Sequence, residues 1–185
     1  MCQSPIKITR FVPLLFCSFI FLAACTIGAP GIHPKVIVTS ESEHIPAGCR
    51  PQEAVDFITR VIEAFNQGDQ ATLETLFALG GWFFQAEVEL VGNRPITSSH
   101  FQTFKLTEWL TYFAERHAHQ EIYQLVELEV SDPGSGRGNG NLAFILYRWA
   151  DDLEPGIHTP GRFVVVRGAM FCNPQRIFSW NMETW

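Results

Sequence analysis

Apolar residues recur every three or four positions between Pro51 and Gln67, which is the spacing of one face of an α-helix. The apolar positions are Ala54, Val55, Ile58, Val61, Ile62 and Phe65. Pro51 suits a first helical turn, where its missing N–H costs nothing, and Gly68 is a typical stop. The pattern therefore predicts a helix over 51–67.

The same spacing predicts two further helices. Asp69 is typical of an N-cap, and it precedes a short helical pattern that we expect Gly80-Gly81 to end. The apolar residues of this short helix are Leu73, Leu76 and Phe77. A third helix is predicted over 107–117, with Leu106, Trp109, Leu110 and Phe113 on one side.

The hydrophobic period changes to two after Gly81, which is typical of a strand with one buried face. The set expected to be buried is Trp82, Phe84, Ala86, Val88 and Leu90, and the set expected in water is Gln85, Glu87 and Glu89. Further strands are predicted over 122–130, 142–149, 162–172 and 176–182. This order of elements favours an α+β domain, with a curved and mostly antiparallel sheet wrapped around an N-terminal helix pair.

The first 24 residues have the composition of a signal peptide, because two basic residues precede an apolar run and two small residues. The apolar run is shorter than the roughly 20 residues that a membrane span needs. Leu22-Ala23-Ala24-Cys25 resembles the lipobox of bacterial lipoproteins, whose cysteine is lipidated and becomes the first mature residue. The resemblance implies a cell-envelope protein, anchored to the membrane on the exported side through lipid on Cys25. The alternative is an ordinary signal, or an uncleaved anchor, with an incidental cysteine.

The segment 25–48 is rich in Pro and Gly and is expected to be a flexible tether of about 25 Å root-mean-square length, with a single α+β domain over 49–185. Val36 to Val38 would fit an edge strand, but the tether is the interpretation we prefer.

Net charge limits the kind of partner that the protein can bind, and the cysteine content indicates whether a disulfide can form. Lys7 and Arg10 are the only charged residues of the predicted signal, so the remaining 161 residues carry 11 basic and 19 acidic side chains, a formal charge of −8. An acidic domain argues against a nucleic-acid partner. Processing would leave Cys49 and Cys172, which are expected to form a disulfide in an exported compartment, the alternative being two free thiols.

Two segments resemble the nuclear transport factor 2-like superfamily, which includes the SnoaL-like polyketide cyclases. The segment 57–69 with Leu73 and 76–78 resembles the family's opening helices, and 168–172 with 176–177 and 180–182 resembles its final hairpin. The similarity covers about 51–184, and a cystatin-like arrangement is the alternative. The resemblance implies a cone, in which a bent sheet wraps a helix and leaves a pouch that serves as catalytic chamber, ligand site or dimer surface.

The isomerase and dehydratase members of that family use an Asp, His or Tyr inside an apolar pouch. In this chain the candidates for the mouth of the pouch are His100, Tyr112, Tyr147, Asp151 and Trp180. The nearest acid–base pair would join His100 to Asp151 or Asp152, although Asp151-Asp152 also fits a solvated turn. None of these residues matches a catalytic motif of the family, so none is assigned a role.

The sequence gives less support for metal, cofactor or phosphate binding. His117 and His119 fit the end of a helix better than a metal site, and no cofactor is expected. Arg148 and Arg167, inside apolar strands, are expected to pair with Glu127 or Glu129. The Gly-rich loop 134–140 joins two strands, whereas phosphate loops lead into a helix.

Three functions remain open. The first is an envelope lipoprotein whose cone binds a small apolar ligand or a protein partner without catalysis, with Trp82, Phe84, Trp109 and Trp180 as the candidate ligand contacts. The second is an envelope isomerase, dehydratase or cyclase. The third is a structural or assembly lipoprotein that pairs, as a homodimer, through the outer face of the sheet.

Overall fold

The computed structural model describes residues 34–38, 44–91, 94–132, 138–151 and 158–184, and for 87–91, 95–99, 149–151, 158–162 and 184 it describes the backbone alone. The predicted signal peptide, Cys25 and part of the predicted tether lie outside these ranges. The helices are α1 (Pro51–Asn66), α2 (Gln70–Leu76) and α3 (Leu106–Ala118). The strands are β1 (Lys35–Ile37), β2 (Phe77–Val91), β3 (Arg94–Thr103), β4 (Ile122–Ser131), β5 (Asn139–Asp151), β6 (His158–Cys172) and β7 (Gln175–Thr184).

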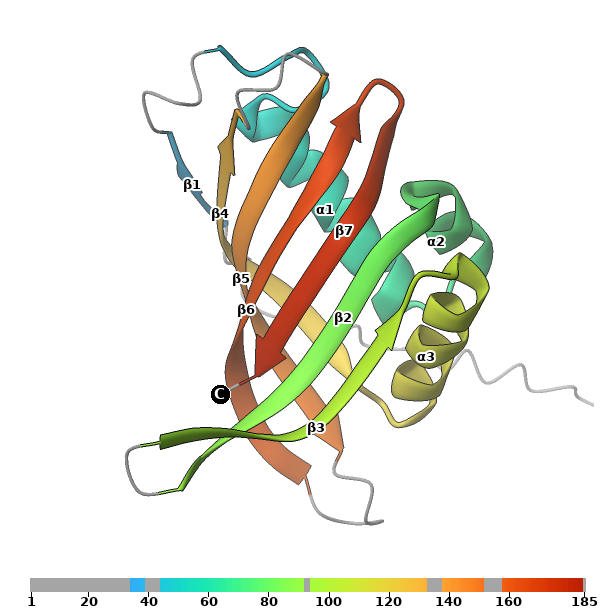
Figure 1. The fold of residues 1–185 in the computed structure, drawn as a ribbon, viewed down its shortest axis with the longest axis vertical. Coiled ribbons are helices and arrows are strands. Elements are labelled where there is room, and N and C mark those ends of the chain that lie inside the picture. Colours follow the sequence, from blue (N-terminus) through green and yellow to red (C-terminus); the bar gives the residue numbers. More distant parts are fainter. Residues whose placement is uncertain (1–33, 39–43, 92–93, 133–137, 152–157, 185) are drawn as a thin grey trace, which may run out of the picture. The chain divides into compact units, whose positions relative to one another are not determined.

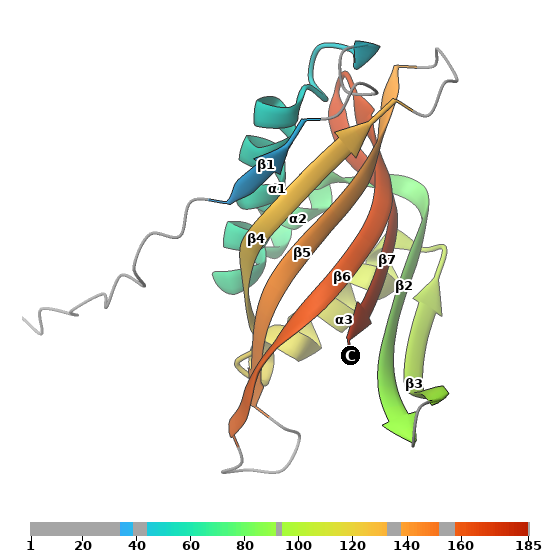
Figure 2. The same ribbon diagram turned by 90° about the vertical axis from the view of Figure 1, so that its left-hand side faces the viewer.

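The seven strands form one curved sheet in the order β1-β4-β5-β6-β7-β2-β3. Neighbouring strands are antiparallel except in two pairs, β1–β4 and β2–β7, which are parallel. All three helices lie on one face of the sheet, with α1 along β4 and α2 and α3 near β2 (Figures 1 and 2). The domain is therefore α+β with a mixed, mostly antiparallel sheet that is not closed, as the sequence predicts.

The predicted helices are confirmed, and their ends have visible causes. Pro51 occupies the first turn of α1, and the Glu53 carboxylate accepts hydrogen bonds from the backbone N–H groups of Gly48 and Arg50, at 2.7 and 3.1 Å. Asp69 caps α2 by accepting a hydrogen bond from the Thr72 N–H at 3.0 Å. The expected end of α2 at Gly80-Gly81 is wrong, because β2 already begins at Phe77 and runs through both glycines.

Gly81 allows β2 and β7 to approach each other. A Cβ atom at this position would lie 2.8 Å from the Phe178 carbonyl oxygen and 2.5 Å from the Phe83 ring. The register between β2 and β7 shifts between Phe77 and Trp82, so the strand continues past the glycines with a changed alignment. Gly81, one of the two glycines that resemble a helix stop, therefore serves close strand packing, whereas a Cβ atom at Gly80 would meet nothing within 4 Å.

The predicted facing of β2 is wrong from Trp82 to Gln85, although Ala86 is buried as predicted, and the side chains of 87–91 lie outside the described part. Phe83 and Gln85 are buried, and they are paired with Trp180 and Met182 of β7, which both belong to the core. Directly paired residues point to the same face of a sheet. Trp82 and Phe84 therefore point to the outer face, which the helices do not cover. The sequence pattern misleads here because Trp82, Phe83 and Phe84 are all aromatic, so hydropathy fits either facing.

The predicted disulfide between Cys49 and Cys172 is present, with the two Cα atoms 4.9 Å apart. It joins the turn before α1 to the last residue of β6. Gly140 of β5 packs against it, since a Cβ atom there would lie 3.3 Å from the Cys49 Sγ. The bridge thus closes one end of the space between α1 and the sheet.

Part of the predicted tether belongs to the domain. β1 pairs with residues 127–129 of β4, the Lys35 Nζ lies 3.0 Å from Glu127 Oε2, and Ile45 is in the core. In the described part of the chain, no helix has the length and hydrophobicity to cross a bilayer.

Candidate functional site

Aromatic side chains fill the space between α3 and the concave face of the sheet. They come from α1, β2, α3, β5 and β7, and their ring centroids lie 4.4 to 6.4 Å apart. The members are Phe65, Phe77, Phe83, Trp109, Phe113, Phe144 and Trp180. We call this set the aromatic interior. Much of the pouch expected from the sequence is therefore occupied by the chain's own rings.

Trp109 is the centre of a stack of nearly parallel rings. Phe83 lies 5.3 Å from it with an angle of 10° between the planes, and Tyr112 lies 5.6 Å away at 13°. Phe101 of β3 stacks on Tyr112 at 4.4 Å and 6°. Stacked ring pairs of this kind contribute about 0.5–1.5 kcal/mol each beyond the burial of their area.

Gln85 places a carboxamide beside this stack. Its side chain is only 2% exposed, and it is paired in register with Phe101 on one side and Met182 on the other. No group of the described residues lies within hydrogen-bonding distance of its Nε2 or Oε1. An unpaired buried polar group costs about 1–3 kcal/mol.

Two indole N–H groups are also buried without a hydrogen-bond partner in the described part of the chain. The Nε1 atoms of Trp109 and Trp180 are buried and have no hydrogen-bond partner within the described ranges. Trp180 is directly paired with Phe83, which is two residues from Gln85 on the same face, and Trp109 stacks on Phe83. The interior therefore contains three neighbouring side chains that are uncharged and have unused hydrogen-bonding capacity.

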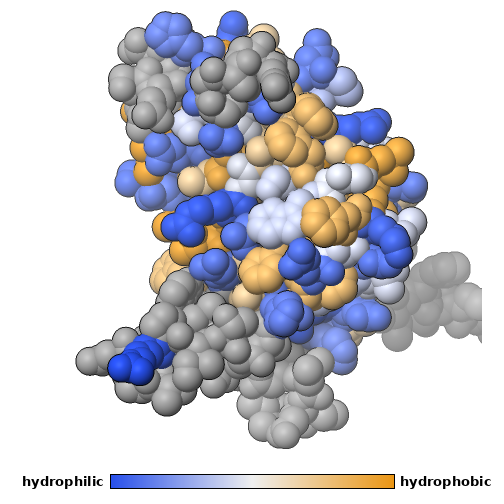
Figure 3. Space-filling view, in the orientation of Figure 1, coloured by the Kyte–Doolittle hydropathy of each residue, from blue (hydrophilic) through white to orange (hydrophobic). Residues whose placement is uncertain are grey.

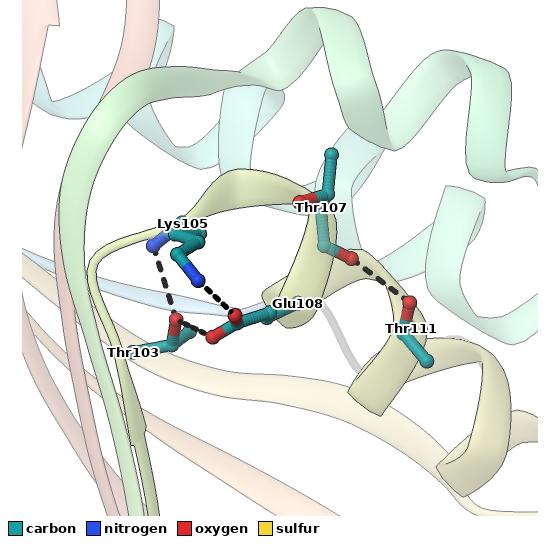
Figure 4. Close-up of polar contacts among 5 residues, drawn as sticks. All are labelled: Thr103, Lys105, Thr107, Glu108 and Thr111. Atoms are coloured by element: carbon teal, nitrogen blue, oxygen red, sulfur yellow. Dashed lines mark hydrogen bonds and ion pairs between the residues drawn. The ribbon is translucent and has the colours of Figure 1, made fainter.

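Polar contacts join the end of β3 to the first turn of α3, directly before Trp109 in the sequence (Figure 4). Thr103 Oγ1 accepts a hydrogen bond from the Lys105 N–H at 3.0 Å and donates one to Glu108 Oε2 at 2.6 Å, while Lys105 Nζ lies 2.7 Å from Glu108 Oε1. The hydrogen bonds from Lys105 and Thr103 lower the pKa of Glu108. These contacts tie the end of β3, which carries Phe101, to the start of α3.

A second polar group lies where α3 meets β4. Glu121 is fully buried, and its carboxylate accepts hydrogen bonds from the Arg116 guanidinium and the Tyr123 hydroxyl. Burial and the adjacent Glu121 charge raise the pKa of Tyr123 well above its usual value. Asn66 holds the backbone of Tyr123 through two hydrogen bonds of 2.8 Å. Both Glu121 oxygens are thus engaged, which does not suit a free general base.

The acid–base residues considered from the sequence do not converge. Tyr112 belongs to the interior stack. His100 lies on the outer face beside Phe84, and Tyr147 lies on the outer face against Phe163. Asp151 ends β5, and its side chain is outside the described part. His100 and Tyr112 therefore lie on opposite faces of the sheet, and Asp152 lies outside the described residues.

The residues predicted to contact a ligand are also divided between the interior and the outer face of the sheet. Trp109 and Trp180 lie in the aromatic interior, whereas Trp82 and Phe84 stack on each other, 6.0 Å apart, on the outer face. Sequence reasoning missed Gln85, Glu121 and Tyr123. The only signal for Gln85 was its place directly after three aromatic residues, and the sequence pattern predicted that its side chain faces water.

Within the described ranges, no group of three or more His, Cys, Asp or Glu residues is arranged to hold a metal ion. His117 lies in the last turn of α3 and His119 is its C-cap, as predicted. The His117 ring packs against Gly68, where a Cβ atom would lie 2.7 Å from it. Arg148 is paired in register with Tyr123 instead of Glu127 or Glu129, and it is 7% exposed, while Arg167 is exposed on the outer face.

A surface pocket of about 220 Å³ lies where α1 and β4 meet the residue before β1. Its lining residues are Pro34, Thr59, Ile62, Glu63, Asn66, Tyr123, Gln124 and Leu125. Glu63 is its only carboxylate, so the pocket offers no pair of acidic groups.

The outer face of the sheet carries a second group of aromatic residues. The members with described contacts are Trp82, Phe84, His100, Tyr147, Phe163, Phe171 and Phe178. Phe163 is 60% and Phe171 is 43% exposed. Figure 3 looks onto this face and shows hydrophobic and neutral side chains over the middle of the sheet, with hydrophilic ones around them.

No family model matches the sequence, and no curated protein matches it either. Solved structures do match. A dehydratase candidate of the NTF2-like family from Streptomyces avermitilis has 16% identity and a TM-score of 0.50, over 72% of this chain and 94% of that chain. The β subunit of benzoate 1,2-dioxygenase from Burkholderia mallei has 8% identity and a TM-score of 0.54, over 72% and 89%.

An uncharacterized protein with a cystatin-like fold from Caulobacter vibrioides has 12% identity and a TM-score of 0.53, over 71% of this chain and 87% of that chain. At these identities the similarity concerns the fold alone. The domain therefore has the nuclear transport factor 2-like cone fold, and this fold hosts unrelated functions.

Proposed function

We propose that the protein is a cell-envelope lipoprotein whose cone binds a small, flat and mostly apolar molecule without transforming it. The observation that carries the proposal is the ring stack around Trp109, whose indole N–H, like that of Trp180, has no partner in the described part of the chain. Small-molecule sites are typically apolar and aromatic, with a few hydrogen-bonding groups that orient the ligand.

Native mass spectrometry of the full chain, purified after export, tests this proposal. We expect a fraction of the protein to carry the extra mass of a bound molecule. Trp109→Phe keeps an aromatic ring but removes the N–H, so the bound fraction should fall. Trp82→Phe on the outer face is the matched control and should retain it. Protein with nothing bound, before and after incubation with a cell-envelope extract, would contradict the proposal.

The proposed location in the cell envelope depends on lipidation of Cys25, which lies outside the described residues. Replacing Cys25 with Ser should release the protein from the membrane fraction or block its processing, whereas Cys17→Ser should leave fractionation unchanged. Membrane association that survives the Cys25 change would contradict the lipid anchor.

An isomerase, dehydratase or cyclase remains the alternative for the same interior. The geometry favours binding, because His100 and Tyr112 lie on opposite faces of the sheet and the buried Glu121 is already hydrogen-bonded to Arg116 and Tyr123. If the molecule that co-purifies is recovered with a changed mass or bond arrangement after incubation, the enzyme would be the better interpretation.

Self-association is a second candidate function, and the exposed aromatic residues of the outer face are the observation that favours it. Sedimentation equilibrium would then show a dimer that Phe163→Arg converts to a monomer. Phe104 is equally exposed at 60% but lies between β3 and α3, so Phe104→Arg is the matched control. A wild-type monomer at all concentrations would exclude pairing.

A further inference from the structure

The surface pocket between α1 and β4 shares no residue with the aromatic interior. It lies where the short strand β1 stops covering β4. β1 pairs with residues 127–129 of β4, so within the described ranges the edge of β4 at 123–125 has no strand beside it on that side. The volume of about 220 Å³ exceeds the roughly 150 Å³ of an engineered cavity that binds benzene, so one ring with a short chain fits.

One side of α1 forms a wall of the pocket. The wall residues are three, four and seven positions apart, which is the spacing of one helix face, and they are Thr59, Ile62, Glu63 and Asn66. Across from them, β4 contributes Leu125. Ile62 and Leu125 belong to the buried core, so the inner part of the pocket is apolar. The pocket therefore suits a ligand with an apolar body.

Two of the polar lining residues already serve the fold. Asn66 Nδ2 donates to the Tyr123 carbonyl oxygen and Asn66 Oδ1 accepts from the Tyr123 N–H, both at 2.8 Å. The Tyr123 hydroxyl donates to the buried Glu121 carboxylate. These contacts hold α1 against β4, so Asn66 and Tyr123 form a fixed wall and their hydrogen-bonding groups are not available to a ligand.

Glu63 gives the pocket a negative charge, and it is in none of the ion pairs that join described residues. Two basic residues close to the pocket in the sequence are directed elsewhere. Lys35 Nζ lies 3.0 Å from Glu127 Oε2, and Arg60, one turn before Glu63, donates to Gln175 Oε1 at 3.0 Å. The chain as a whole carries a formal charge of −6, which also favours a positive ligand.

We infer that this pocket binds a small organic cation, with its ammonium group at Glu63 and its apolar body against Ile62 and Leu125. The site is separate from the interior of the proposed function and does not depend on it. An ammonium group has three N–H donors, and the lining adds the hydroxyl of Thr59 and the amide oxygen of Gln124 as further acceptors. An anionic ligand would meet Glu63 with a like charge.

Three probes of nearly equal size test the inference by NMR titration of the isotope-labelled full chain. 3-Phenylpropylamine is the cation, 3-phenylpropan-1-ol is the uncharged alcohol, and 3-phenylpropanoate is the anion. The amine should shift the backbone amide signals of residues 59–66 and 123–125, which line the pocket. We expect it to bind about five-fold more tightly than the alcohol, the ratio given by one ion pair at an accessible carboxylate, and the anion to bind most weakly.

Glu63→Gln keeps the shape of the side chain but removes its charge. It should lower the affinity for the amine about five-fold, to that of the alcohol, and leave the affinity for the alcohol within about two-fold. Asp56→Asn is the matched control, because Asp56 is an exposed carboxylate of the same helix outside the pocket, and it should change neither affinity. Thr59→Phe places a ring in the pocket and should weaken the binding of amine and alcohol alike.

The outcomes distinguish this site from the interior. Equal binding of amine and alcohol, or a preference that survives Glu63→Gln, would overturn the cation class, as would tightest binding of the anion. Probe-induced shifts at the indole N–H signals of Trp109 and Trp180, without shifts at the pocket, would overturn this site and support the interior. If no probe shifts the pocket signals, the pocket is not a ligand site, and the proposed function is unaffected.

Discussion

Glu121 is the only acidic side chain in the buried set of the described residues, and it connects α3 to β4. Arg116 comes from the last turn of α3, Glu121 follows the helix, and Tyr123 belongs to β4. The pair is stable because each charge meets its partner directly and the remaining carboxylate oxygen is satisfied by a hydroxyl.

Removing the Glu121 charge should be costly, because the mostly buried Arg116 would lose its counter-charge. Glu121→Gln is expected to lower the free energy of unfolding by about 3–5 kcal/mol, measured by urea denaturation at pH 7. Glu115→Gln, at an exposed position of the same helix, should change it by less than about 0.5 kcal/mol. Equal effects of the two substitutions would show that the buried pair contributes nothing.

Tyr123 makes stability depend on alkaline pH. Its pKa is raised in the folded state by burial and by Glu121, so above its usual value of about 10 the unfolded chain loses the phenolic proton while the folded chain keeps it. Unfolding is then favoured as pH rises, by up to about 1.4 kcal/mol for each pH unit between the two pKa values. Tyr123→Phe should flatten the profile between about pH 9 and 11, and Tyr147→Phe should not.

The role of a single residue can be predicted from the sequence only when that role does not depend on how the strands are aligned in the sheet. Cys49 and Cys172 were predictable as a pair, since the predicted processing left no other cysteine. Gln85 was not, because its burial follows from the register of β2 against β3 and β7, and Phe83 and Phe84 fit the inward position equally well by hydropathy.

At the scale of elements, the start and end of α1 and the start of α2 were predicted to within about one residue, because Pro51, Gly68 and Asp69 act through neighbouring backbone groups. β3 was missed, since its sequence Arg-Pro-Ile-Thr-Ser-Ser-His-Phe-Gln-Thr is largely polar and lacks a regular alternation. It is stabilised as an edge strand by pairing with β2. β1 consists of three residues and depends on β4 in the same way.

The cap of α2 gives an element-scale prediction. Hydrogen bonds from the side chain and backbone of Thr72 lower the pKa of Asp69 below its ordinary value of 3.8. The ionised Asp69 cap therefore stabilises the fold fully at pH values above 3.8. This contribution disappears as the pH falls through the lowered pKa of Asp69 in the folded state. Asp69→Ala should lower the melting temperature by a few degrees at pH 7, and this difference should shrink below about pH 4.

Glu74 is the control for this prediction, because it is exposed in the same short helix. Glu74→Ala should leave the melting temperature nearly unchanged at both pH values, measured by circular dichroism. A difference for Asp69→Ala that stays constant down to pH 2 would show that the charge of the cap is irrelevant.

On the scale of the whole molecule, the order of elements was enough to indicate the fold class, and the resemblance to the nuclear transport factor 2-like superfamily implied the cone. The parallel pairing of β2 with β7 was not predictable, because the paired residues are 97 to 100 positions apart in the sequence and no local turn connects the two strands. The division of aromatic residues between interior and outer face follows from that pairing, so the site could only be found with the sheet assembled.

The disulfide gives a prediction at the same scale. Cys49 and Cys172 are 123 residues apart, and in the chain-entropy model a loop of this length contributes about 4–5 kcal/mol, with measured bridges often giving less. The double substitution of both cysteines by Ser should lower the free energy of unfolding by about 2–5 kcal/mol. Reductant should destabilise the wild type to the same extent and leave the double variant unaffected.

All three helices and the strands β2 to β6 lie between the two linked cysteines, so only β1 and β7 are outside the covalent ring. A protease that cuts a loop inside this ring opens the backbone but leaves both fragments attached to each other. Such a nicked molecule would migrate as one chain without reductant and as two with it. For a protein expected to face an extracytoplasmic compartment, the bridge therefore provides tolerance to damage in addition to stability.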